Sequence, residues 1–348
     1  MRVSMKKMFS LSPALCFILI STALTAQSST NHYTITKWKV EGDAGWDYVS
    51  IDEASQRLFI SHGNMVQVLN VKDGQVIGAI PNTKGVHGIA LATDLDKGFI
   101  SDGRDTAVTI FKLSDLSVIA KIKVTGNNPD AILYDPYSRK VFTFNGRSNN
   151  ATVIDALTGN IITTILLDGK PEFAVSDDAG KIYVNIEDKS EISLINPVTM
   201  KVEKSWSVVP GEEPSGLALD NKNHRLFAVC DNKLMIVMDA NTGKVITKLP
   251  IGGNVDGVAF DSALNRVYSS NGDGTLTIIQ EEDADHFKVL DNLKTQKSAR
   301  TITVNTTTHH LYLPTADFGP KPEPTTENPR PRAPITPGSF VILDIKPE

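Results

Sequence analysis

Seven polar residues recur along the chain at intervals of 40 to 44 residues, each at the predicted start of a short apolar strand: Asp47, His87, Asp130, Glu172, Ser215, Asp256 and Arg300. Carboxylates and an imidazole that lie close together can ligate a divalent cation or transfer a proton. An arginine beside them can hold an anionic group. If the fold brings these residues to one axis, mutual repulsion should raise the pKa of some carboxylates, while Arg300 or a bound cation should lower others. The spacing therefore predicts a polar site.

This set supports two kinds of chemistry. The first is a lactonase-like, metal-assisted hydrolase or lyase. In such an enzyme the oxygen ligands of one divalent metal ion would be Asp130, Glu172, Asp256 and Asn145. His87 would then be the general base, and Arg300 would orient an anionic substrate. In a binding protein, the same residues would hold a small molecule or a partner protein. Polar residues around an axis also fit a water-filled channel in which they only satisfy the strand ends.

A sequence repeat supplies the elements that position these residues. Aromatic residues mark the second strand of each repeat at intervals of 40, 43, 41, 44, 41 and 44 residues: Phe59, Phe99, Phe142, Tyr183, Phe227, Tyr268 and Tyr312. Turn residues such as Lys72-Asp73-Gly74 and Asn241-Thr242-Gly243 separate the third strand from the fourth. Between turns the chain alternates with period two. Seven units of four short strands predict an all-β fold, a seven-bladed β-propeller.

The two ends of the chain complement each other once the N-terminal segment 1–26, a predicted signal peptide described below, is left out. The last repeat contains three predicted strands, at 300–305, 310–314 and 339–345, and the alternating segment 33–40 can supply the fourth. Pairing the N-terminal strand with the last blade would close the ring and remove two sheet edges. We therefore expect one propeller domain over residues 27–348.

Loops between second and third strands should open on the same face as the polar ring. They carry further candidate ligand-binding residues, Arg104, Asn145 and Arg147, among ordinary turn formers. In the last repeat this loop is a Pro-rich insertion at 314–337 with eight prolines, which disfavours regular strand. It is either a lid or docking segment, or a tolerated surface insertion.

Two stretches carry a family resemblance. Thr152-Val153-Ile154-Asp155-Ala156-Leu157-Thr158-Gly159-Asn160-Ile161-Ile162 and Lys181-Ile182-Tyr183-Val184-Asn185 resemble the YVTN repeat of the YncE-like family of β-propeller proteins. The resemblance extends over the mature chain and implies an exported, seven-bladed propeller. The four-residue motif is degenerate here, as in Phe59-Ile60-Ser61-His62. The family implies no single shared activity.

The N-terminus predicts export. Arg2, Lys6 and Lys7 precede an apolar stretch at 8–20, and small residues follow at 21–26, the pattern of a signal peptide cleaved after Ala23 or Ala26. The alternative is an uncleaved anchor, although the apolar run is shorter than the roughly 20 residues of a membrane span. We expect a periplasmic or secreted protein with no membrane span after cleavage.

Charge and cysteine content narrow the function further. Cleavage after Ala26 removes three basic and no acidic side chains, leaving 32 basic against 40 acidic residues and a net charge of −8. Such a chain repels phosphate backbones, so nucleic acid is not an expected partner. Cys230 alone remains, which excludes an intramolecular disulfide. We expect a monomer that binds a small molecule or a protein at the channel mouth, with the metal-dependent enzyme as the alternative.

Overall fold

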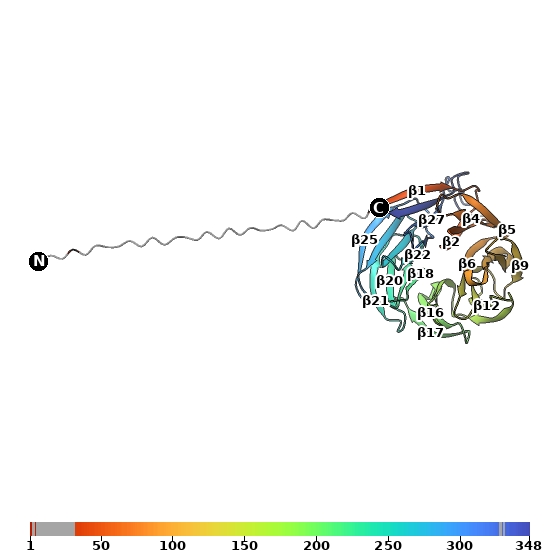
Figure 1. The fold of residues 1–348 in the computed structure, drawn as a ribbon, viewed down its shortest axis with the longest axis horizontal. Helices are drawn as coiled ribbons and strands as arrows, with labels where there is room; N and C mark the ends of the chain where they lie inside the picture. The colour runs from red at the N-terminus through yellow and green to blue at the C-terminus, as the bar shows by residue number, and fades with distance from the viewer. Residues whose placement is uncertain (2–3, 5–31, 327–328, 330) are drawn as a thin grey trace. The chain divides into compact units, whose positions relative to one another are not determined.

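The computed structural model describes residues 32–326, 329 and 331–348, together with residues 1 and 4. The predicted signal peptide therefore lies almost wholly outside the described residues. Within them the chain forms seven four-stranded antiparallel sheets arranged around a central axis (Figure 1). This confirms the seven-bladed β-propeller. No helix among the described residues is long and apolar enough to cross a membrane.

Each blade runs from an innermost strand outward, in sequence order except in the last blade. Blade one contains β2(Trp46–Asp52), β3(Arg57–His62), β4(Met65–Asn70) and β5(Val76–Pro81), and blade two contains β6(Val86–Ala92), β7(Lys97–Asp102), β8(Ala107–Lys112) and β9(Val118–Lys123). Blade three contains β10(Pro129–Asp135), β11(Lys140–Asn145), β12(Asn150–Asp155) and β13(Ile161–Leu166), and blade four contains β14(Pro171–Ser176), β15(Ile182–Ile186), β16(Glu191–Asn196) and β17(Lys201–Ser207). Blade five contains β18(Pro214–Asp220), β19(Arg225–Cys230), β20(Leu234–Asp239) and β21(Val245–Pro250), and blade six contains β22(Val255–Asp261), β23(Arg266–Asn271), β24(Thr275–Glu281) and β25(Phe287–Lys294). Blade seven contains β26(Thr303–Val304), β27(Leu311–Thr315), β28(Val341–Pro347) and β1(Tyr33–Lys39). Three single 3₁₀ turns, η1(Thr93–Leu95), η2(Gly103–Asp105) and η3(Glu187–Lys189), lie in connections.

The last blade is closed by the N-terminal strand, as the sequence predicts. β1 pairs antiparallel with β28 over seven residues, from Tyr33 opposite Pro347 to Lys39 opposite Val341. The expected innermost strand at 300–305 is shorter in the structure, because only β26 pairs with β27. Arg300 therefore precedes the strand instead of starting it.

The core lies between blades. Seven apolar clusters each combine residues of two neighbouring sheets, so every blade packs on both sides. The seven repeat aromatics are at most 1% exposed. Because each large aromatic fills the wedge between two twisted sheets, the repeat in sequence becomes a repeat in packing.

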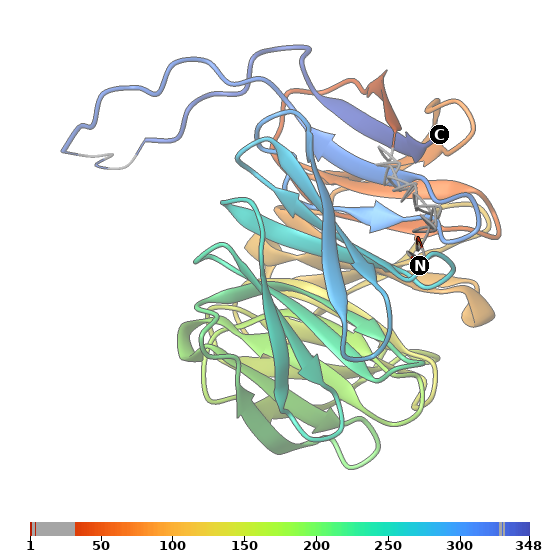
Figure 2. The same ribbon diagram turned by 90° about the vertical axis from the view of Figure 1, so that its left-hand side faces the viewer.

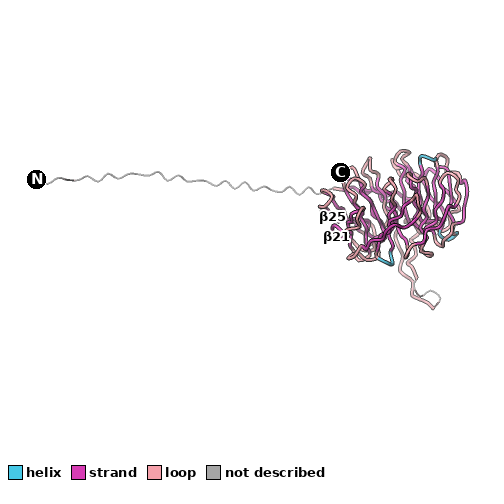
Figure 3. The backbone as a smooth tube through the Cα atoms, turned by 90° about the horizontal axis from the view of Figure 1, so that it is seen from below, coloured by secondary structure: helices cyan, strands magenta, loops and turns pink. Residues whose placement is uncertain are grey.

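Tight turns follow the sequence pattern. Gly243 adopts φ +73° between β20 and β21, and a Cβ there would lie 2.1 Å from the Trp206 ring. Only glycine meets both demands. In the Pro-rich insertion, Phe318 and Ile335 form an antiparallel bridge at the base of an arm that projects from one face of the propeller (Figures 2 and 3).

Candidate functional site

The structure brings the seven predicted polar residues to one end of the central channel. Six are the second residue of an innermost strand, for example Asp47 in β2 and Glu172 in β14. Each innermost strand contacts its two neighbours around the axis, so these side chains gather at one mouth. We call Asp47, His87, Asp130, Glu172, Ser215, Asp256 and Arg300 the mouth ring.

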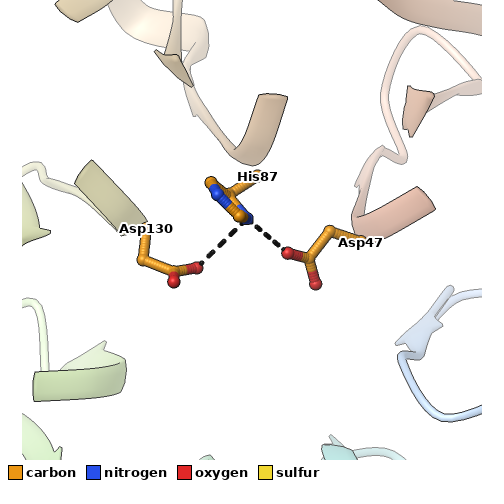
Figure 4. A group of neighbouring side chains, drawn as sticks. All are labelled: Asp47, His87 and Asp130. Carbon is orange, nitrogen blue, oxygen red and sulfur yellow. Dashed lines mark hydrogen bonds and ion pairs between the residues drawn. The ribbon is translucent and has the colours of Figure 1, made fainter. Parts of the chain in front are cut away.

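Three members of the mouth ring point toward one another, from blades one, two and three (Figure 4). His87 Nδ1 lies 2.6 Å from Asp47 Oδ2 and 3.5 Å from Asp130 Oδ1. Burial acts to lower the pKa of His87, but the bond to Asp47 and the charge of Asp130 outweigh it and raise the pKa to about 9. Burial raises the pKa of Asp130 to about 6, against the opposing charge of His87. One ligand atom from each residue lies within 4.8 Å of the others, a spacing that can hold a metal ion.

The other acids of the mouth ring face cations. Arg300 forms an ion pair with Asp256, and Lys170 Nζ lies 2.5 Å from Glu172 Oε1 and also contacts Glu187. Burial first, and then the charge of Asp130, raises the pKa of Glu172 to about 8. Burial raises the pKa of Asp256 to about 6, although Arg300 opposes the shift. Ser215 instead donates to the Val255 carbonyl at 3.2 Å.

The four predicted oxygen ligands do not form one cluster in this structure. Asp130 lies with Asp47 and His87, while Glu172 and Asp256 are each held by a cation. Asn145 does not reach the channel: it is fully buried, donates its amide to Asn150 and Thr152, and accepts from Thr143. This bonding joins two strands of one blade, so the Asn145 amide is already occupied within its own blade.

Side chains at the ends of other second strands are bonded within their own blades in the same way. His62, Asp102 and Asn271 are the last residues of their second strands, and their buried side chains bond to Gln67, Thr109 and Thr277 of the third strand. Arg104 and Arg147 are exposed on their loops. Within the described part of the chain, neither guanidinium forms a hydrogen bond or ion pair with the mouth ring.

Lys170 is a site residue that the sequence analysis missed. It stands two positions before Glu172, and the corresponding positions in the other six repeats are Gly45, Gly85, Asn128, Glu213, Asn254 and Ser298. Lys170 is the single cation at this position of the seven repeats. An alignment of the repeats could therefore have singled it out.

Two aromatic residues close the channel beneath the mouth ring. The position after each ring residue is small in four blades, Gly88, Ala131, Gly216 and Gly257, but is Tyr48 in blade one and Phe173 in blade four. Their ring centroids are 5.4 Å apart, and Tyr48 also packs against the cluster between blades three and four. A cavity of only about 70 Å³ lies beside them. Burial and the charges of Asp130 and Glu172 hold the pKa of Tyr48 well above its usual value. Tyr48 and Phe173, the aromatic floor, were also missed.

Comparison with known proteins places the chain among propellers. It is 28% identical to YncE of Salmonella typhi and 27% identical to YncE of Salmonella typhimurium, in each case over 103 residues. These matches cover 29% of this chain and 29% of the length of each relative. No family model matches the chain. The chain is a seven-bladed β-propeller that is similar to YncE over part of its length.

Solved structures agree on the fold alone. Kuenenia stuttgartiensis hydrazine synthase superposes with a TM-score of 0.69 and 14% identity, covering 79% of this chain and 94% of that chain. U3-55K superposes with a TM-score of 0.74 and 9% identity, covering 89% of this chain and 98% of that chain. At such identities a shared propeller says nothing about a shared activity.

Proposed function

We propose that this YncE-like propeller is an exported, monomeric binding protein that holds a small cationic ligand at the mouth ring. The observation that carries the proposal is the convergence of six ionisable side chains from six blades at one channel mouth. Sites that bind ligands gather such groups where burial and neighbouring charges perturb them.

The charge balance favours a cation as the ligand. The mouth ring and its Lys170 partner Glu187 contribute five carboxylates, on Asp47, Asp130, Glu172, Glu187 and Asp256. They face three cations, His87, Lys170 and Arg300. The acids therefore outnumber the bases, and a small cation that enters the mouth would reduce the repulsion among the carboxylates. A metal ion or an organic amine meets this requirement, whereas a phosphate does not.

A metal-assisted hydrolase or lyase is the second candidate, favoured by the cluster of Asp47, His87 and Asp130. One imidazole and two carboxylates are ligands that zinc and other divalent transition metals accept, and open coordination positions can take a water or a carbonyl oxygen. In this version His87 is a metal ligand and not the general base. Arg300, next to Asp47 around the ring, would orient an anionic substrate.

Calorimetric titration of the mature protein, residues 27–348, tests the binding function. Zn²⁺, Mn²⁺, Ca²⁺ and 1,4-diaminobutane are the probes. We expect one of them to bind in a one-to-one ratio, and Asp130→Asn to weaken that binding at least tenfold. Asp231→Asn, an exposed acid on a loop outside the mouth ring, is the matched control and should leave the affinity unchanged. Equal affinities in all three proteins, or no binding of any probe, would overturn the proposal.

Elemental analysis separates the enzyme from the binding protein. Protein prepared without chelators that carries about one equivalent of a divalent metal, lost in His87→Ala, and that hydrolyses a lactone or ester would establish the second candidate. Metal-free protein that binds only the diamine would exclude it.

A further inference from the structure

The central channel has a second compartment at the end opposite the mouth ring. It is lined by residues that stand three or four positions after the ring residues in six innermost strands: Ile51, Leu91, Leu133, Val175, Leu219 and Phe260. Every one of them is apolar and half-buried. The repeat that places charged residues at one end of each strand thus places apolar residues near the other end.

This apolar chamber is large enough for a ligand. The larger cavity has a volume of about 430 Å³, and an adjoining cavity of about 390 Å³ shares Ile89, Leu91, Phe173, Val175 and Leu219 with it. Pockets for drug-sized ligands range from about 300 to 1,000 Å³. Beside the aromatic floor the channel narrows to the 70 Å³ cavity, so the floor separates the chamber from the mouth ring.

The lining determines the chemistry of the occupant. Among the residues that the structure describes, no charged residue lines the larger cavity, and the polar side chains that line it are those of Ser50 and Thr303. The Ser50 hydroxyl already donates to the Ile89 carbonyl at 2.7 Å. Of the described residues that line the adjoining cavity, one is charged, Asp178. An ion placed in the chamber would lose its hydration without gaining a partner, so the chamber selects a neutral molecule.

The ring closure keeps the chamber open. The innermost strands are fixed by their own blades and by the strand pairing that closes blade seven, so they cannot move inward to bury the apolar side chains. The chamber is also concave, with strands of six blades around it. A small molecule placed on the channel axis can contact apolar side chains of several blades at once.

We propose that the apolar chamber binds a neutral small molecule with an aliphatic or aromatic body, independently of the cation site at the mouth ring. The molecule enters from the end opposite the mouth ring, and the aromatic floor of Tyr48 and Phe173 forms the end of its site. The chain would then hold two ligands of opposite character at the two ends of one channel.

Titration with Nile red, a neutral fluorophore that brightens in apolar surroundings, tests this proposal on residues 27–348. We expect saturable binding of one dye per protein. Leu219→Trp fills the chamber and should weaken the affinity at least tenfold. Leu166→Trp is the matched control, because Leu166 is 78% exposed on the outer strand β13, and it should bind as the unchanged protein does.

A second filling variant, Val175→Phe, carries the test if Leu219→Trp does not fold. Asp130→Asn should leave dye binding unchanged, which separates this site from the mouth ring. Saturable binding that both folded filling variants retain, or an absence of saturable binding, would overturn the proposal whatever the result of the cation titrations.

Discussion

Ser101 is expected to join two blades at the mouth ring, and replacing it by alanine tests this role. Ser101 lies in β7 and is fully buried. Its hydroxyl accepts the Gly88 amide N–H at 2.8 Å and donates to the backbone carbonyl of Asp130 in the next blade. Ser270 makes the corresponding bond to the Arg300 carbonyl at 2.6 Å. The repeat therefore uses the third position of its four-residue motif to hold the backbone of ring residues.

The size of the effect follows from the two bonds. Loss of the bond to the Asp130 carbonyl costs about 0.5–1.5 kcal/mol, and a buried N–H of Gly88 left without a partner costs about 1–3 kcal/mol. We therefore expect Ser101→Ala to lower the free energy of unfolding by about 2–4 kcal/mol. Ser117→Ala is the control, because the exposed Ser117 hydroxyl donates to Asp115, a close neighbour in sequence, and joins no two blades. It should change the free energy of unfolding by less than about 0.5 kcal/mol.

Urea unfolding, followed by both tryptophan fluorescence and far-ultraviolet circular dichroism, measures the difference. Coincident transitions with an unchanged dependence on urea would justify comparing the two free energies. If Ser101→Ala unfolds within about 0.5 kcal/mol of the unchanged protein, the hydroxyl does not join the blades and the reasoning is refuted.

Three further outcomes are expected. Burial, together with nearby Asp220, raises the pKa of Glu281 to about 7, so the protein should lose stability as the pH rises from about 4.5 through 7. Glu281→Gln should remove the part of that loss that Glu281 causes and be more stable at pH 8 by up to about 3 kcal/mol, and equal urea midpoints at pH 8 would contradict this. Trp38→Ala should destabilise the closing strand by roughly 2 kcal/mol, because the indole packs 5.4 Å from the Tyr312 ring; an unchanged urea midpoint would show that this contact does not support closure. The Cys230 side chain is fully buried, and this burial raises the pKa of its thiol to about 12. A thiol reagent at pH 8 should therefore label the mature protein only after unfolding. Rapid labelling of the native protein would contradict the burial.

Much of the fold could be predicted because its determinants are local and repeated. Alternation with period two specifies strands, turn residues such as Gly243 specify hairpins, and the spacing of the seven aromatics specifies the blades. Closure by residues 33–40 was also predictable, since an unpaired strand at one end and an incomplete blade at the other have one common solution. The shortness of β26 could not be predicted, because the length of a strand depends on the hydrogen bonds that the neighbouring strand can form with it.

The candidate site could likewise be predicted only in part. Membership of the mouth ring follows from position in the repeat, so Asp47 and Arg300 could be placed at one mouth from the sequence alone. The partners of each charge could not be assigned: His87 lies against Asp47, while Glu172 is held by Lys170. Asn145 fits the pattern of a ligand in sequence but is occupied within its own blade.

The sequence by itself determined the number of blades and the residues at the channel mouth, because each repeat marks one blade and one ring position. It also determined the closure of the ring, because the N-terminal strand complements the incomplete last repeat. Only the tertiary structure decided how the ring charges pair and how the channel is divided. Those features depend on side chains from different blades, such as Tyr48 reaching Phe173, and no local pattern records a contact between residues 125 positions apart. The pairing of charges and the aromatic floor exist only when all seven blades surround one axis.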